Sequence, residues 1–371
     1  MLKFRSAVIA VTVLAAITVL PVASSQADST SAGSQQAGED SGKFGSQSIE
    51  DSPNSRGSHE GVYYPTRERS QSSSSSTPPP SPSTAGGLGA VTYRGGTIMA
   101  NPTSYVIWYG NWDPNSCRAQ SGTNSTASII KDLVSNIGGT AWNAINATYY
   151  QVINGKKTFV PNSIDYSGCT VDPGSQGLSL DGASGPQVSD VVKNAISKEK
   201  LRNDSNGVYL VLVAANVNVE GFLTTFCGYH SAFVNRNTVI KYSFIGDPSA
   251  SLGSCISQIA VSPNGNVVAD GMASVLAHEL VEPISDPLGY SWFDDAGFEN
   301  ADKCAWTYGA AVKAADGSFS NMTIGGRKYL IQQNVAANTN VCVSSVTSSG
   351  SENSSNSSDR SSSGSKKSSG K

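Results

Sequence analysis

The residues best suited to chemistry lie together in the run His278-Glu279-Leu280-Val281-Glu282. On a helix, His278 and Glu282 are four residues apart and therefore share one face. A neutral imidazole and a carboxylate one turn apart can hold a divalent cation from the same side. Glu279 lies beside them, where a general base would take a proton from water bound to that cation. The run therefore predicts a metal site, with catalysis as one use of it.

Further carboxylates follow within about two dozen residues: Asp286, Asp294, Asp295, Glu299 and Asp302. So many oxygen ligands suit calcium, magnesium or manganese as well as zinc. Two other interpretations stay open. One is a carboxylate cluster at a helix end with a structural histidine, and the other is a structural calcium site.

The run resembles the zincin metalloproteases, above all the gluzincins, whose pattern is His-Glu-Leu-x-His-x-x-x-Asp. The resemblance implies that His278 is a ligand and Glu279 the general base. It also implies that Asp302 is the third ligand, with Glu299 as its substitute. In this chain Glu282 replaces the second histidine, and a proline follows it directly. Because proline lacks the N–H donor and disfavours helix at the preceding residue, we expect the helix to end or kink at Glu282.

The elements that must position this run follow from apolar periodicity. Apolar residues at steps of three and four predict the metal-bearing helix over 271–282, with Asp270 and Gly271 as start signals. Other patterns predict strands at 105–109 and 208–213, helices at 129–137 and 188–196, and a hairpin of 232–234 with 239–244. We therefore expect one mixed α/β (α+β) domain over 88–346. The zincin resemblance implies that its sheet packs on the metal-bearing helix.

The flanking segments predict export. Residues 1–27 have a basic start, an apolar core, and small residues at Ser25 and Ala27, as in a signal peptide cleaved after Ala27. A retained N-terminal anchor is the alternative. Residues 28–87 and 347–371 are rich in Ser, Pro or Gly and are expected to be a disordered stalk and tail. The net charge of −3 leaves no nucleic-acid footprint. We expect a secreted, extracellular protein with no membrane contact after cleavage.

Six cysteines fall in the expected domain: Cys117, Cys169, Cys227, Cys255, Cys304 and Cys342. An even number in an exported chain predicts three disulfides, for which about 15 pairings are possible. We expect sequential pairing, 117–169, 227–255 and 304–342, which would tie the Asp302 loop to the C-terminal strand. Sequons that make the chain a candidate glycoprotein begin at Asn124, Asn146, Asn203, Asn321, Asn353 and Asn356.

Several blocks taken together resemble the Exordium, or phosphate-induced, family of secreted plant and oomycete proteins. The blocks are Tyr93–Gly96, Val106–Trp112, Cys227–His230, and Val275–Leu280 with Glu282 and Asp286-Pro287. The resemblance implies an apoplastic or wall-associated protein linked to cell expansion and growth signalling, in a family with no firmly assigned enzymatic activity. Pro283 is a local departure from its pattern.

Two functions remain open from the sequence. The first is a metal-dependent hydrolase, plausibly a peptidase, with Glu279 as base and His230 as a further ligand or a transition-state donor. The alternative for His230 is a packed residue beside a disulfide. The second function is a non-catalytic module in which a structural cation supports binding of an extracellular peptide, a wall polymer or a receptor. An open coordination position would favour the enzyme, and a closed shell would favour the structural site.

Overall fold

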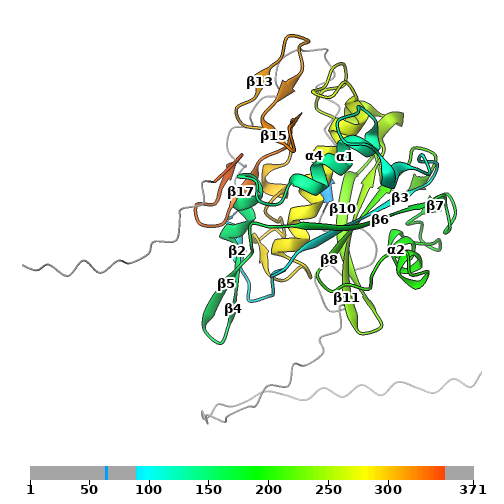
Figure 1. Ribbon diagram of the computed structural model, residues 1–371. Helices are drawn as coiled ribbons and strands as arrows, with labels where there is room; N and C mark the ends of the chain where they lie inside the picture. The colour runs from blue at the N-terminus through cyan, green and yellow to red at the C-terminus, as the bar shows by residue number, and fades with distance from the viewer. Residues whose placement is uncertain (1–62, 66–88, 347–371) are drawn as a thin grey trace, which may run out of the picture. The chain divides into compact units, whose positions relative to one another are not determined.

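A six-stranded mixed sheet runs through the computed structural model, which describes residues 63–65 and 89–346 (Figure 1). Its order is β1-β10-β11-β8-β3-β6. The bounds are β1 Tyr63–Pro65, β10 Phe226–Asn235, β11 Thr238–Gly246, β8 Gly207–Val213, β3 Thr103–Tyr109 and β6 Asp165–Asp172. Strands β11, β8, β3 and β6 are parallel, whereas β10 is antiparallel to β11 and β1 to β10. The described part is thus a mixed α/β domain; the expected signal peptide and C-terminal tail lie outside the described residues.

Helices cover both faces of the sheet. They are α1 Thr126–Asn136, α2 Val188–Ser197, α3 Leu252–Cys255 and α4 Val267–Ser285, with 3₁₀ turns η4 Ser116–Arg118, η5 Asn143–Thr148, η6 Pro248–Ala250 and η7 Asp302–Cys304. Trp108 and Leu210 belong to the core that includes α1 and α4, whereas Ile107 and Val211 belong to the core on α2. Since β6 and β8 flank β3 on opposite sides, right-handed crossovers from β3 to β6 and back to β8 place α1 and α2 on opposite faces.

Short ladders complete the domain outside the main sheet. They pair β2 Thr92–Tyr93 with β12 Trp292–Phe293, β4 Tyr150–Ile153 with β5 Lys156–Phe159, β7 Ser179–Leu180 with β9 Asn218–Val219, β13 Val312–Lys313 with β14 Phe319–Ser320, β15 Met322–Ile324 with β16 Arg327–Tyr329, and β17 Asn334–Ala336 with β18 Val341–Val343. No helix among the described residues is both long and apolar enough to cross a bilayer.

The central helix α4 is longer than the sequence predicts at both ends. It begins at Val267 because the side chain of Asn266 accepts a hydrogen bond from the Ala269 N–H, a standard N-cap. The predicted start signal Asp270 lies inside the helix and accepts hydrogen bonds from Asn264 instead. Of the two outcomes expected at Glu282, an end or a kink, the end is not observed, since the helix continues through Pro283 to Ser285.

A tertiary contact explains why the proline is tolerated. Pro283 has no N–H to donate to the carbonyl of Glu279 one turn earlier. Ser243 of β11 donates its hydroxyl to that carbonyl at 2.6 Å, and both residues are buried. The sheet therefore supplies a donor that the helix itself lacks.

The predicted disulfides are confirmed as Cys117–Cys169, Cys227–Cys255 and Cys304–Cys342. The last joins η7 to β18. Two other expectations are corrected. Tyr63–Pro65 falls in the stalk expected to be disordered, yet it pairs with β10.

The second correction concerns Asn146, expected as a surface sequon. It is only 1% exposed, and its side chain donates to the Val281 carbonyl and accepts from Asn300 and Asn334. Both the nitrogen and the oxygen of the Asn146 amide therefore make buried hydrogen bonds, one of them to α4, and Asn146 is not a surface glycosylation site. The exposed sequon residues in the described part are Asn124 and Asn203.

We predict that Ser243→Ala lowers the free energy of unfolding by about 1 to 3 kcal/mol, because it removes the donor to the buried Glu279 carbonyl. Pro283→Ala restores a backbone N–H one turn away, so the same serine substitution should cost less in that background. Chemical denaturation of the two single variants and the double variant measures the coupling. Strictly additive losses would contradict this account of the proline.

Candidate metal centre

The C-terminal half of α4 carries three ionisable residues into the protein interior. His278, Glu279 and Glu282 are each 0% exposed. They lie against β10 of the sheet and against the chain that follows α4 as far as η7, which places His230, Glu299 and Asp302 around them. Sequence analysis named all six residues, and the structure brings them into one cluster.

One side of the cluster forms around the Oε1 atom of Glu282. The Nε2 atom of His278 lies 3.2 Å from this oxygen and 3.4 Å from Oδ1 of Asp302. Glu282 Oε1 also accepts the backbone N–H of Asp302 at 3.0 Å, and Asp302 Oδ2 accepts the N–H of Glu299 at 3.1 Å. The loop that ends in η7 is therefore attached to α4 through the candidate ligands themselves.

The other side forms around the Oε2 atom of Glu282. The Nε2 atom of His230 lies 3.3 Å from this oxygen and 3.3 Å from Oε2 of Glu299. His230 comes from β10, two residues after Gly228, and its side chain is 5% exposed. Glu282 is thus shared by two groups of candidate ligands, one on each of its oxygens.

Several atoms of the second group point at one another without hydrogen bonds. Among the described residues, His230 Nε2, Glu282 Oε2 and both side-chain oxygens of Glu299 are buried and have no hydrogen-bond partner. Buried polar atoms are nearly always hydrogen-bonded, and a protonated His230 or a bound cation would each satisfy this group. Two ligands bound about 2.0 to 2.1 Å from a tetrahedral zinc ion lie about 3.3 Å apart. Donor atoms of His230, Glu282 and Glu299, and those of His278, Glu279 and Glu282, lie close enough together that each group could hold one ion.

Electrostatics in the cluster are set by burial and by crowding of like charges. Burial alone would raise the pKa of Glu282, but the neighbouring imidazoles outweigh it and lower the pKa to about 2. Burial and then the charge of Glu282 raise the pKa of Asp302 to about 6. Burial alone would lower the pKa of His278 and His230, but their carboxylate neighbours hold both well above the ordinary value. Without an ion, the cluster therefore retains protons.

Glu279 lies directly against β10, the strand next to the edge strand β1. A Cβ atom on Gly228 would come within 2.8 Å of Glu279 Oε1 and 2.7 Å of Val275 Cγ1, so only glycine allows this approach. Burial is the main reason that the pKa of Glu279 is raised to about 8. A carboxyl with a pKa near neutrality suits a general acid or base.

Gln332 is a member of the site that sequence analysis missed. Its Nε2 atom lies 2.7 Å from His278 Nδ1 and 3.1 Å from the carbonyl of Ala301. In this orientation the Gln332 amide nitrogen donates to Nδ1 as well as to the Ala301 carbonyl. Coordination through Nε2 of His278 would place the ring proton on Nδ1, and the amide would then have to turn over so that its oxygen accepts that proton. No sequence signal marks Gln332, because it lies in a short run after β16.

The structure separates three other carboxylates from the cluster's donor set. Asp286 accepts the backbone N–H groups of Tyr290, Ser291 and Trp292 and so shapes the turn after α4. Asp294 pairs with Lys303 at 2.8 Å, and Asp295 pairs with Arg94 at the surface. These three carboxylates lie near the candidate ligands in the sequence, but their contacts stabilise the loop after α4.

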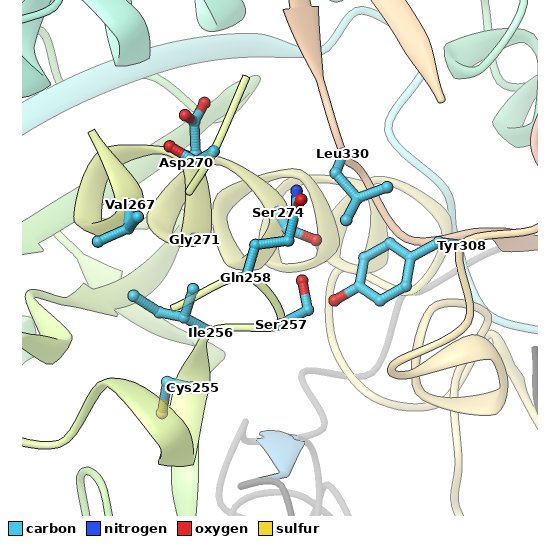
Figure 2. A pocket seen from close by; sticks show the side chains of 11 residues that line it. Cys255, Ile256, Ser257, Gln258, Val267, Asp270, Gly271, Ser274, Tyr308 and Leu330 are labelled. Carbon is cyan, nitrogen blue, oxygen red and sulfur yellow. The ribbon is translucent and has the colours of Figure 1, made fainter. Parts of the chain in front are cut away.

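The cluster is enclosed in this conformation. A small pocket lies along the N-terminal half of α4, lined by Val267, Gly271, Ser274, Tyr308 and Leu330 among others (Figure 2). Its free volume of about 10 Å³ is roughly the room for a single water, and its lining contains none of the candidate ligands.

For the metal-free protein we predict that the free energy of unfolding falls as pH rises from about 5 to about 8. Over this range the folded state keeps protons on Asp302 and Glu279 that the unfolded chain has lost. The raised pKa values of His230 and His278 act in the same direction. Denaturation in EDTA at several pH values measures the trend, and Glu279→Gln should weaken it. A free energy of unfolding that rises throughout this range would contradict these protonation states.

Comparison with known proteins identifies relatives across most of the folded part. The family profile described as "Phosphate-induced protein 1 conserved region" matches residues 91–345. "Protein EXORDIUM-like 3" of Arabidopsis thaliana is 30% identical over 65% of this chain and 78% of its own. "Protein EXORDIUM" of the same plant is 24% identical over 68% of this chain and 88% of its own. "Protein PHOSPHATE-INDUCED 1" of Nicotiana tabacum is 22% identical over 68% and 87%, respectively.

No solved structure matches the chain. The range matched by the profile includes every residue of the cluster, from His230 to Gln332. The chain belongs to the Exordium, or phosphate-induced protein 1, family.

Proposed function

We propose that this Exordium-like protein is an extracellular, metal-dependent hydrolase with a zincin-like site that cleaves peptide bonds. The observation that carries the proposal is the convergence on Glu282 of buried donors, several without hydrogen bonds. A long helix that presents His278, Glu279 and Glu282 from one side of a sheet supports the zincin-like arrangement. The three disulfides and the predicted signal peptide support an extracellular location.

The donors divide into two ion positions. The first ion would be held by His278 and Glu282, with Glu279 or Asp302 as a further ligand, and His230, Glu299 and Oε2 of Glu282 provide a matching second position. Glu279 completes a set of four buried carboxylates, whose negative charge two divalent ions would balance. The donor set of nitrogen and oxygen atoms suits zinc or manganese, with calcium as the oxygen-preferring alternative.

The chain's own groups have distinct roles in this proposal. When bound, the ion supplies Lewis acidity for a peptide carbonyl and for water. Glu279 accepts the proton of the attacking water and returns it to the leaving amine. Its pKa is about 8 in the absence of an ion, and a cation beside it would lower that pKa and so favour the ionised form that a base needs. Gln332 orients His278 from behind, through Nδ1.

A second candidate function is a non-catalytic module with a structural ion. The enclosure of all candidate ligands supports it, since a closed shell is typical of a structural site. The ion would tie η7 to α4, and the surface would bind a wall polymer, an extracellular peptide or a receptor.

Elemental analysis of protein purified without chelator tests the metal centre. We expect one or two equivalents of a divalent metal per chain, and loss of at least one equivalent in His278→Ala, because that variant removes a ligand. His59→Ala is the matched control, since His59 lies outside residues 91–345, which the family profile matches. A wild-type protein that contains no metal, and takes up none on dialysis against zinc, manganese or calcium, would reject the proposal.

Glu279→Gln tests catalysis. We expect it to lower peptide hydrolysis by about 10² to 10⁴-fold while the bound metal is retained, because it removes the proton acceptor and leaves the ligands. Turnover of a peptide library, followed by mass spectrometry, gives the readout. Asp295→Asn, at an exposed carboxylate, is the control. Metal without turnover in the wild type would establish the structural candidate instead.

A further inference from the structure

The strand β10 has an outer edge that a segment far away in sequence covers. Tyr63–Pro65 pairs with it in antiparallel register, with Tyr63 opposite Tyr229, Tyr64 opposite Gly228, and Pro65 opposite Phe226. An uncovered edge strand presents free N–H and C=O groups that recruit another strand. In this chain the recruited strand is the chain's own.

The covered stretch is the one beside the candidate metal centre. Gly228 is the residue that Glu279 approaches closely, and His230 lies two positions further along the strand. Figure 1 shows β1 as the short blue segment near α4 and β10, and α4 contacts it. Among the described residues, no named strand pairs with the outer edge of β10 over 231–235. The segment thus pairs with β10 at Gly228 and Tyr229, and the described strands provide no partner for the same edge over 231–235.

We propose that the outer edge of β10 beside Glu279 is a binding site for an extended peptide, and that Tyr63–Pro65 occupies it as a built-in competitor. Backbone hydrogen bonds to an exposed sheet edge are a general way to hold an extended peptide of varied sequence. A peptide on this edge would pass Glu279 at Gly228, which has no side chain to hold the two apart. This deepens the proposed function by assigning the peptide site, but binding itself requires neither an ion nor turnover.

The pairing of β1 suits a segment that can be released. It contains three residues, and its register shifts between Tyr64 and Pro65. Pro65 has no N–H to donate, so pairing cannot continue regularly through it. Because the segment is covalently attached to the domain, its effective concentration at β10 is high, and it can occupy the edge even if its own affinity is low. The basic residues Arg67 and Arg69 follow directly, so a cut there would remove the tether on the domain side.

The test compares full-length chains in EDTA, so that no bound metal contributes. Tyr63→Pro combined with Tyr64→Pro removes two backbone donors from β1. Ser74→Pro combined with Ser75→Pro is the matched control in the serine tract. Hydrogen exchange of the amides over 228–230 is measured in each chain, together with binding of a synthetic peptide of residues 60–67. A thermal transition like that of the wild type shows that the domain is intact.

We expect about tenfold or faster exchange at the outward amides of the Tyr63/Tyr64 variant, and no change in the control. The added peptide should bind the variant at least about tenfold more tightly than the wild type and restore protection, because the competitor is gone. Unchanged exchange in the variant would overturn the occupancy, and a peptide that binds neither chain would overturn the binding site. Because all readouts are made without metal, a failure of the hydrolase proposal would not alter them.

Discussion

The need to bury Glu282 together with three further carboxylates and two imidazoles is the constraint on which the rest of the site depends. Charged groups removed from water are costly unless they are paired, hydrogen-bonded, or bound to an ion. Each surrounding element contributes to this pairing: α4 supplies His278, β10 supplies His230, and η7 supplies Asp302. The Cys304–Cys342 disulfide and the backbone contact from Asp302 to Glu282 attach the loop that closes the cluster.

Two residues of the sheet make this geometry compatible with the sequence of α4. Ser243 donates to the carbonyl that Pro283 leaves without its helical partner, so α4 continues past Glu282. Gly228 lacks a Cβ and lets Glu279 lie against β10. One contact is polar and the other steric, but both allow the helix and sheet to approach closely where the ionisable residues are. The proposed chemistry therefore depends on residues that touch no ion.

The family profile matches the domain that contains the cluster, but it does not include the strand β1. The cluster lies wholly within residues 91–345, the region described by the family profile. The segment Tyr63–Pro65 lies outside that region, although it completes the sheet beside the cluster. In our interpretation the matched domain contains the site, and the flanking chain controls access to its edge. In this interpretation the burial of the candidate ligands depends on the position of the flanking segment as well as on the matched domain.

Local sequence determined the parts of this protein that depend on short-range spacing. Four-residue spacing placed His278 and Glu282 on one helical face, and buried runs marked strands such as 208–213. Periodicity reports which face of an element is buried, and these two features need nothing more. The sequential pairing of the cysteines was also expected correctly, but the sequence left about 15 pairings possible and the structure decided among them.

Only the tertiary structure decided which distant residues complete the site. It placed Glu299 and Asp302, which the zincin resemblance had already singled out, beside different imidazoles, and it assigned Asp286 to a turn. It brought His230 to the other oxygen of Glu282 and Gln332 behind His278, and it buried the sequon residue Asn146. The extension of α4 through Pro283 had the same origin, because the compensating donor belongs to β11. The spacing of residues along the chain does not show which side chains meet when distant elements pack together. Those tertiary contacts determine where each ionisable side chain of the cluster is stabilised.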